Sequence, residues 1–450
     1  MKSLNILYAA LLLLFFSGIY SCQKDEPVQQ LTPLEYDSEV ARDWFALQCV
    51  LVKETPGMFP PQAARAFSYS GITLYESVVK GWPGAPSLAG QLTDFNEMFT
   101  PHYDSDKTYH WEIVANAALA DMNRYMLEKT ISQENKQEID DLEKQWLDQL
   151  SSGTPEDVVA RSVAYGKAVA SGIFQYSKSD GGHEQYVDPF QLPYTWPTGP
   201  GAWKPTGATP NPLAPKWLFN RPFLQDNIAE AQPFPHMQFS TDPGSEFYKA
   251  ALDVYHIVNT NTAEEVEITK FWADDPFNTC TPTGHTFNIM GQLLEENSAS
   301  LGMAAVAYAR LGIAENDAFI CCWKTKYDYF LVRPVTYIKE HIDPNFNTVI
   351  GTPPFPAYTS GHATEAGAGS RIFTAMFTDG DGAYPFTDRT QIQFGFSVRN
   401  FNNFDQMAEE CADSRLYGGI HYDTDNLNGL KMGKSVGDNV NKRINWPNWK

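Results

Sequence analysis

The feature that most constrains the fold is a series of helix-forming segments rich in small residues. Residues 63–76 and 111–121 are rich in alanine and carry apolar side chains at helical spacing. Further segments expected to be helical are residues 133–149, 155–176, 245–330, 363–377, 404–417 and 427–443. No convincing alternating strand pattern separates them. We therefore expect an all-α protein built from packed helical bundles.

One stretch interrupts the helical pattern. Residues 180–245 are dense in Pro, Gly, Trp and Tyr, and so many aromatic residues argue against disorder. We expect an ordered loop wrapped over the helices, or alternatively a lid or wall over an active site. It separates an N-terminal helical region, residues 36–179, from a C-terminal domain, residues 246–450. A second, acidic loop is expected at residues 378–400.

The N-terminus has the pattern of a processing signal. The apolar run at residues 6–16 is too short to span a bilayer and is typical of a signal-peptide core. Ser21 precedes Cys22, which resembles a bacterial lipoprotein box and implies a signal peptide over 1–21, acylation of Cys22 and a tether over 22–35. The chain is then an exported outer-membrane lipoprotein with a lipid anchor. The run after Cys22 resembles a cell-surface export tether, and ordinary secretory cleavage is the alternative.

The charge argues against a nucleic-acid partner, and the cysteine spacing argues against a zinc site. The formal net charge is −21, from 54 acidic and 33 basic residues, so we expect no nucleic-acid partner. The five cysteines after Cys22 lack CxxC spacing, which argues against a zinc site. Their odd number leaves at least one thiol unpaired, and we assign no disulfide.

Three short segments near the C-terminus carry the chemistry. They read KYDYFLVRP from residue 326, PPFPAYTSGH from residue 353 and SRLYGGIHYDTD from residue 414. They contain three cations, two histidines, a hydroxyl, a glycine and a carboxylate, namely Lys326, Arg333, Arg415, His362, His421, Ser360, Gly361 and Asp425. Cations, a hydroxyl and a backbone N–H suit a tetrahedral oxyanion. The two imidazoles remain for a nucleophile or ligand and for acid–base work.

Local patterns predict how these residues are presented. Lys326 and Arg333 lie seven positions apart, two helical turns, so both can face one cavity, with Arg333 at the helix end because Pro334 follows it. Ser360 is expected to cap a helix whose N-terminus favours an anion. If another helix begins near His421, the carboxylate four residues later can orient its ring.

These motifs carry a family resemblance. Lys-x6-Arg-Pro, Ser-Gly-His and Ser-Arg-x5-His-x3-Asp resemble the type 2 phosphatidic acid phosphatase and vanadium haloperoxidase superfamily, with Thr359 standing where that family usually has Pro. The resemblance implies that Lys326, Arg333, Ser360, Gly361 and Arg415 hold the oxyanion. It implies that His421 provides the axial nitrogen. This nitrogen is a ligand of vanadium in haloperoxidases, or the nucleophile that attacks phosphorus in phosphatases. Asp425 then orients His421, and His362 is the acid–base group.

The surroundings of the motifs favour one branch of the superfamily. Residues 353–364 and the Trp323-Lys-x-Lys326 run resemble soluble vanadium chloroperoxidases, in which aromatic residues at the positions of Trp323 and Phe355 border the halide site. Core packing is the alternative role for both rings. Asp274 or Asp275 resembles a second carboxylate near the axial histidine.

Three functions remain open on the sequence. The favoured one is a haloperoxidase-like enzyme that holds vanadate and oxidises halide with hydrogen peroxide. The alternative is an exported acid phosphatase without a cofactor, acting on phosphomonoesters through a phosphohistidine. A lipoprotein that only captures phosphate is the third, but capture needs no paired acid–base histidines.

The lipoprotein interpretation predicts a change of localisation. Replacing Cys22 by Ala removes the acylated sulfur, so the protein should move from the membrane fraction to the soluble fraction of a bacterial host. Fractionation followed by immunoblotting measures this. A wild-type chain that is already soluble and unacylated would contradict the interpretation.

Overall fold

Helices dominate the chain, as the small-residue pattern predicts. The computed structural model describes residues 30–379 and 382–448, so the predicted signal peptide, Cys22 and most of the tether lie outside the described residues. The helices are α2 (Glu39–Glu54), α3 (Pro60–Val78), α4 (Trp111–Leu127), α5 (Gln133–Ser151), α6 (Glu156–Ser177), α7 (Asp226–Glu230), α8 (Glu246–Thr260), α9 (Ala263–Phe271), α10 (Thr281–Glu296), α11 (Leu301–Tyr329), α12 (Pro334–His341), α13 (Gly361–Phe377), α14 (Phe404–Tyr417) and α15 (Asp423–Arg443). The expected all-α class is confirmed.

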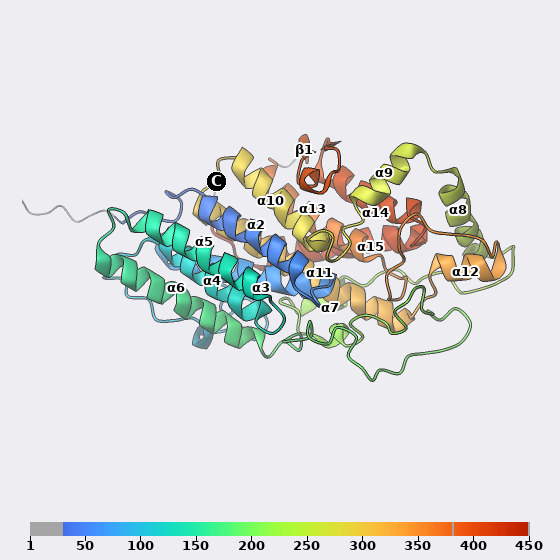
Figure 1. The fold of residues 1–450 in the computed structure, drawn as a ribbon, viewed down its shortest axis with the longest axis horizontal. Helices are drawn as coiled ribbons and strands as arrows, with labels where there is room; N and C mark the ends of the chain where they lie inside the picture. Colours follow the sequence, from blue (N-terminus) through green and yellow to red (C-terminus); the bar gives the residue numbers. More distant parts are fainter. Residues whose placement is uncertain (1–29, 380–381, 449–450) are drawn as a thin grey trace, which may run out of the picture. The chain divides into compact units, whose positions relative to one another are not determined.

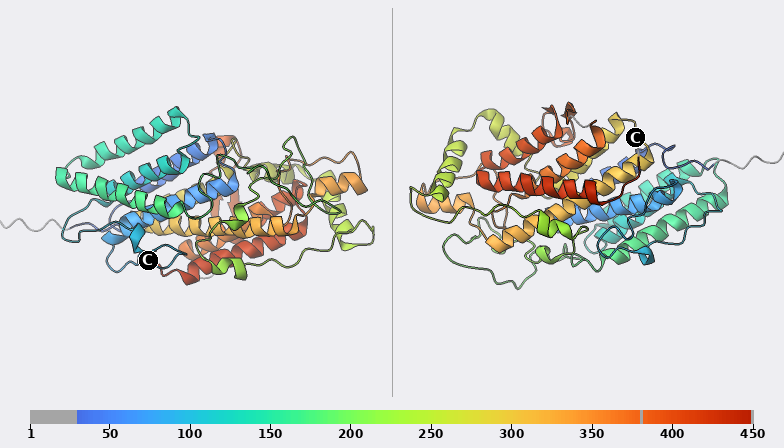
Figure 2. Two further views of the ribbon diagram at one scale, coloured as in Figure 1. Left: turned by 90° about the horizontal axis from the view of Figure 1, so that it is seen from below. Right: turned by 180° about the vertical axis from the view of Figure 1, so that it is seen from behind.

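Helix α11 is the central element of the unit formed by residues 32–450. One group of helices, α2 to α6, lies on one side of it, with α3 packed directly along it. Helices α13 and α15 pack against it from the other side, and α14 packs on both of them (Figure 1; Figure 2). Nearly every residue of α11 is buried, including Lys326 in its last turn. A site at this end of the helix is therefore reached by solvent only through a cavity.

Small residues allow these helices to approach closely. A side-chain carbon added at Gly71 of α3 would lie 2.5 Å from the carbonyl oxygen of Tyr308, and one added at Gly312 of α11 would lie 2.5 Å from the Cα of Ser68. Between α15 and α13, a carbon added at Gly433 would lie 1.8 Å from the Thr364 carbonyl oxygen. The small residues therefore have two roles. Alanine favours helix formation, and glycine allows neighbouring helices to pack closely.

The aromatic-rich stretch at residues 180–245 is an ordered loop with only short helices, η3 (Trp217–Phe219) and α7. Backbone hydrogen bonds attach it to the catalytic half of the chain. The Trp203 N–H donates to the Phe330 carbonyl, and the Leu213 N–H donates to the Pro354 carbonyl, each at 2.8 Å. The loop therefore borders two of the three motif segments.

Three local features differ from the sequence prediction. Residues 32–35 already form a turn bonded to the start of α11, so the tether ends sooner than expected. Helix α15 begins at Asp423 rather than near residue 427. The acidic loop contains an antiparallel pair of strands, β1 (Phe386–Asp388) and β2 (Arg399–Phe401). Strands of three residues are too short to show a recognisable alternation.

No helix within residues 30–379 and 382–448 is both long enough and apolar enough to cross a membrane. The five cysteines in the described part of the chain are all buried and unpaired.

The close contact between α13 and α15 predicts a stability difference between two glycine substitutions. Gly433→Ala places a methyl group against the Thr364 carbonyl and should lower the free energy of unfolding by about 2–3 kcal/mol. Gly369→Ala, in α13, meets only ordinary contacts of 3.5 Å or more and should be neutral or raise stability by about 0.5–1 kcal/mol. Chemical denaturation measures both. Equal effects would show that close packing at Gly433 does not limit the fold.

Candidate active site

Five helix ends deliver the motif residues to one place. Lys326 comes from the last turn of α11, and Arg333 is the N-cap residue of α12. Ser360 caps α13, and its hydroxyl accepts a bond from the Ala363 N–H. Arg415 lies in the last turn of α14, and His421 immediately precedes α15. Helix N-termini carry free N–H groups and positive potential, so this arrangement favours an anion.

Lys326 and Arg333 reach the site from different elements, which corrects the prediction of one continuous helix. Helix α11 ends at Tyr329, and Phe330 adopts a left-handed conformation with φ 48°. The chain then runs extended to Arg333, which Pro334 holds in a non-helical conformation at the start of α12.

The partners of His421 determine its tautomer. Its Nδ1 lies 2.9 Å from Asp425 Oδ2, and its Nε2 lies 3.0 Å from Arg333 Nη1. A guanidinium only donates hydrogen bonds, so Nε2 must carry a lone pair and Nδ1 the proton. Burial, followed by the Arg333 charge, holds the pKa of His421 well below its usual range. The ring is therefore neutral, and the Nε2 lone pair, which here accepts from Arg333, is able to bind an electron-poor centre instead.

Asp425 connects two motif segments. Its backbone carbonyl accepts a hydrogen bond from the Ser360 N–H at 3.0 Å, while its carboxylate holds His421. Burial alone would raise the pKa of Asp425, but interactions with His236 and His421 hold it well below its usual range. Sequence reasoning found no role for His236, because it lies 189 positions away from Asp425 and no local motif surrounds it.

Three buried cations lack carboxylate partners. Lys326 and Arg333 are 0% exposed and Arg415 is 1% exposed. Among the ion pairs of the described residues, none includes these side chains, and Arg333 Nη2 has no hydrogen-bond partner there. Buried charges are normally paired. Three unpaired cations beside a lone-pair nitrogen therefore form a site for an anion.

Burial lowers the pKa of two of these cations, Lys326 and Arg333. It lowers the pKa of Lys326 to about 7, with the nearby Arg333 charge adding to the effect. It lowers the pKa of Arg333 to about 9. Arg333 stays charged near neutral pH, whereas an anion bound close to Lys326 would favour the charged form of Lys326, so anion binding and protonation are coupled here.

Lys326 anchors the loop that precedes α13. Its Nζ donates to the carbonyl oxygens of Pro356 and Ala357, each at 3.0 Å, and to that of Thr359. Its three donors are therefore occupied by the backbone that positions Ser360. The structure shows Lys326 shaping the oxyanion site, and its predicted direct contact with the anion stays a prediction.

His362 stands at the junction of two cavities. Its Nε2 lies 3.3 Å from the Ala273 carbonyl oxygen and 3.5 Å from Arg415 Nη1. Burial, and then the Arg415 charge, keep the pKa of His362 well below the usual range, so the ring is neutral. A neutral imidazole at a cavity wall is able to accept a proton.

The inner cavity is a chamber of about 30 Å³ between His421 and His362, lined also by Gly361, Trp323 and Phe355. This exceeds the roughly 10–15 Å³ that one water needs. A side chain at Gly361 would extend to within 3.9 Å of Phe319 and Trp323 and would narrow the chamber.

An outer cavity of about 320 Å³ opens onto His362 and Arg415. Its wall is largely apolar and includes Phe59, Leu213 and Phe355. Leu213 belongs to the aromatic-rich loop, which supports the alternative that this loop is a wall of the site. Phe59 comes from the N-terminal region, to which the motifs gave no functional role.

The two predicted halide-site rings adjoin each other. The Trp323 and Phe355 centroids are 5.1 Å apart, and Lys326 Nζ lies 5.0 Å from the Phe355 centroid. Both rings line the inner chamber, and their role toward halide stays a prediction.

Among the described residues, no hydrogen bond or ion pair joins either candidate second carboxylate to His421. Asp274 pairs with His285 at 2.9 Å, and both Asp274 and Asp275 line the outer cavity on the side of Arg415. His285 is also paired with Asp388 at 2.9 Å, so Asp274, His285 and Asp388 form a buried ion-pair cluster in the core.

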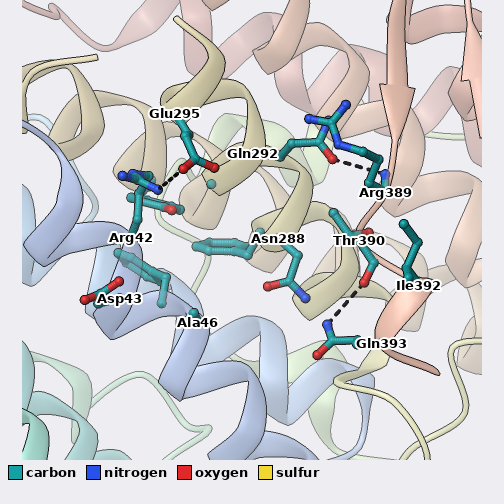
Figure 3. A pocket seen from close by; sticks show the side chains of 14 residues that line it. Arg42, Asp43, Ala46, Asn288, Gln292, Glu295, Arg389, Thr390, Ile392 and Gln393 are labelled. Atoms are coloured by element: carbon teal, nitrogen blue, oxygen red, sulfur yellow. Dashed lines mark hydrogen bonds and ion pairs between the residues drawn. The ribbon is translucent and has the colours of Figure 1, made fainter. Parts of the chain in front are cut away.

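A separate hollow of about 570 Å³ lies between α2, α10 and the segment after β1 (Figure 3). Its arginines are neutralised, since Arg42 pairs with Glu295 at 3.4 Å and Arg389 pairs with Glu296. None of the predicted site residues lines it. This hollow therefore lacks the buried cations without ion-pair partners that the motif segments bring together.

Comparison with known proteins agrees with this geometry. A family model described as VCPO second helical-bundle domain matches residues 306–446, which contain all three motif segments. The vanadium chloroperoxidase of Curvularia inaequalis is 26% identical over 180 residues, which cover 28% of this chain and 30% of that protein. The chain therefore matches less than a third of that curated relative's length.

Solved structures match over much more of the chain. The first bacterial vanadium-dependent iodoperoxidase superposes with a TM-score of 0.81 and 31% identity, covering 94% of this chain and 98% of that one. A holo-type bacterial vanadium-dependent chloroperoxidase has a TM-score of 0.66 and 14% identity, covering 91% and 98%, which is a likeness of fold alone. The chain belongs to the vanadium-dependent haloperoxidase family, whose members are enzymes.

The unpaired cations predict selective losses of anion affinity. Arg333→Ala and Arg415→Ala should each weaken vanadate and phosphate binding by about 1.5–3 kcal/mol, because each removes a charge-assisted hydrogen bond. Isothermal titration with each anion measures this. Arg389→Ala, which removes an arginine already paired in the separate hollow, is the control and should leave affinity unchanged. Equal affinities in all three variants would contradict the site.

Proposed function

We propose that the protein is a vanadium-dependent haloperoxidase that oxidises halide with hydrogen peroxide at a vanadate held by His421. One observation carries the proposal, namely the lone pair of a neutral His421 Nε2 facing buried cations that have no carboxylate partners. Family membership and the iodoperoxidase and chloroperoxidase relatives support it.

The residues present fit vanadate. Among the described residues, Arg333 Nη2 is a buried donor without a partner, and Gly361 and His362, at the N-terminus of α13, line the inner chamber together with His421. His421 would provide the nitrogen ligand, and Arg333 and Arg415 would provide the counter-charge. When bound there, vanadate would supply an electron-poor centre at which hydrogen peroxide becomes reactive toward halide.

The chain's own residues account for the other requirements. Asp425 keeps the His421 proton on Nδ1, so that Nε2 stays available. His362 is placed to take a proton from peroxide entering through the outer cavity and to return it. The reaction, H₂O₂ + X⁻ + H⁺ → HOX + H₂O, consumes one proton, so a proton-carrying group on this path is required.

Phosphate has the same shape and charge as vanadate, so the anion site alone suits a phosphatase too. Assays of the purified protein with and without orthovanadate separate the functions. Halide oxidation that requires both vanadate and peroxide would support the proposal. Phosphomonoester hydrolysis that vanadate inhibits, without halide oxidation, would contradict it.

The two histidines predict opposite defects. His421→Ala removes the axial nitrogen and should abolish stable vanadate binding. His362→Ala leaves the anion site intact and should keep vanadate but lose turnover by about 10²–10⁴-fold, the usual loss for an acid–base residue. Equilibrium dialysis and halide-oxidation rates on both variants check this. If His362→Ala loses the anion and His421→Ala keeps it, the roles are reversed.

A further inference from the structure

We propose that His236 is a positioning residue that holds Asp425 from the side opposite His421, which completes a chain of three side chains behind the anion site. This inference rests on the proposed function, because it assigns His236 a task in orienting the axial ligand.

The carboxylate of Asp425 lies between two imidazoles. Its Oδ2 is 2.9 Å from His421 Nδ1, and its Oδ1 is 3.3 Å from His236 Nε2. The 3.3 Å contact is an ion-pair distance that is poorly aligned for a hydrogen bond, and within the described residues neither His236 Nε2 nor Asp425 Oδ1 has a hydrogen-bond partner. The three side chains are 1%, 0% and 3% exposed for His236, Asp425 and His421, so water does not substitute for either contact.

The second nitrogen of His236 sets the orientation of its ring. Nδ1 lies 3.0 Å from the carbonyl oxygen of Met237, which can only accept a hydrogen bond. Both ring nitrogens therefore face acceptors, and the ring satisfies both only when each nitrogen carries a proton. In that form the Nε2 proton points toward Asp425 Oδ1.

The loop around His236 is fixed on both sides. The Tyr358 hydroxyl donates to the Phe234 carbonyl, and the Tyr337 hydroxyl donates to the Ser240 carbonyl at 2.6 Å. The His236 ring also packs edge-on against Tyr358, with centroids 4.8 Å apart and planes at 71°. These contacts place the imidazole before any ligand binds.

Removing His236 would leave Asp425 Oδ1 buried without a partner. An unsatisfied buried carboxylate oxygen is unfavourable, so the carboxylate would turn or draw in water. In either case its hold on His421 Nδ1 would loosen, and the Nε2 lone pair would point toward the anion site less often. Loss of such a supporting partner typically costs 10–100-fold in metal affinity.

The test compares vanadate affinity with the state of the His421 ring. His236→Ala should weaken vanadate binding by about 10–100-fold. In ¹⁵N NMR spectra of histidine-labelled, vanadate-free protein it should turn the Nδ1-protonated form of His421 into a mixture of tautomers. His236→Gln, whose amide can donate to Asp425, should restore most of both properties. In an Asp425→Asn background, His236→Ala should have no further effect.

His110→Gln is the matched control, since His110 is a half-buried histidine that precedes α4 and contacts Tyr36. It should change neither readout. Equal affinity in wild type and His236→Ala, no rescue by Gln, or additive effects with Asp425→Asn would each overturn the proposal. If His236→Ala does not fold, two other measurements decide the question. One is the comparison of His236→Gln with wild type. The other is the wild-type spectrum, in which both His236 nitrogens should be protonated.

The same measurements distinguish this inference from the proposed function. A wild-type protein that binds vanadate but does not oxidise halide contradicts the haloperoxidase assignment, while the affinities still test His236. If wild type binds no vanadate, the spectra of the vanadate-free protein still support or overturn the placement of His236.

Discussion

The burial of positive charge without carboxylate partners is the constraint on which the site depends. Lys326, Arg333 and Arg415 are removed from water at the junction of five helix ends, where burial lowers their pKa values. A protein interior ordinarily neutralises such groups with nearby acids. Here backbone carbonyls and a neutral imidazole surround them instead, so the favourable electrostatic interaction is left for a bound anion. The acidic surface of the chain makes this local excess of positive charge more pronounced.

Close helix packing makes this arrangement possible. Glycines at the contacts of α11 with α3 and of α15 with α13 allow backbones to approach until side-chain carbons would collide. That packing fixes the N-terminus of α13 beside the start of α15, where the Asp425 carbonyl accepts the Ser360 N–H. The hydroxyl-bearing segment and the axial histidine are therefore positioned by one residue.

Much of this was predictable from local patterns. Alanine-rich periodicity predicted α3, α4 and α13, because helix propensity and apolar spacing are properties of neighbouring residues. The motifs also predicted that His421 and Asp425 would meet, since four positions correspond to about one helical turn. The single-helix presentation of Lys326 and Arg333 was wrong, because the left-handed Phe330 ends α11 before the second residue is reached.

The sequence by itself determined the helical class and the eight residues of the motif segments, because both depend on short-range spacing. Only the tertiary structure decided which groups surround them. It assigned the donors of Lys326 to the loop carbonyls, placed Phe59 and Leu213 on the cavity wall, and moved Asp274 to the side of Arg415. It also brought His236 to Asp425. These contacts join residues far apart in the chain, and they arise from the packing of complete helices and loops rather than from any local pattern.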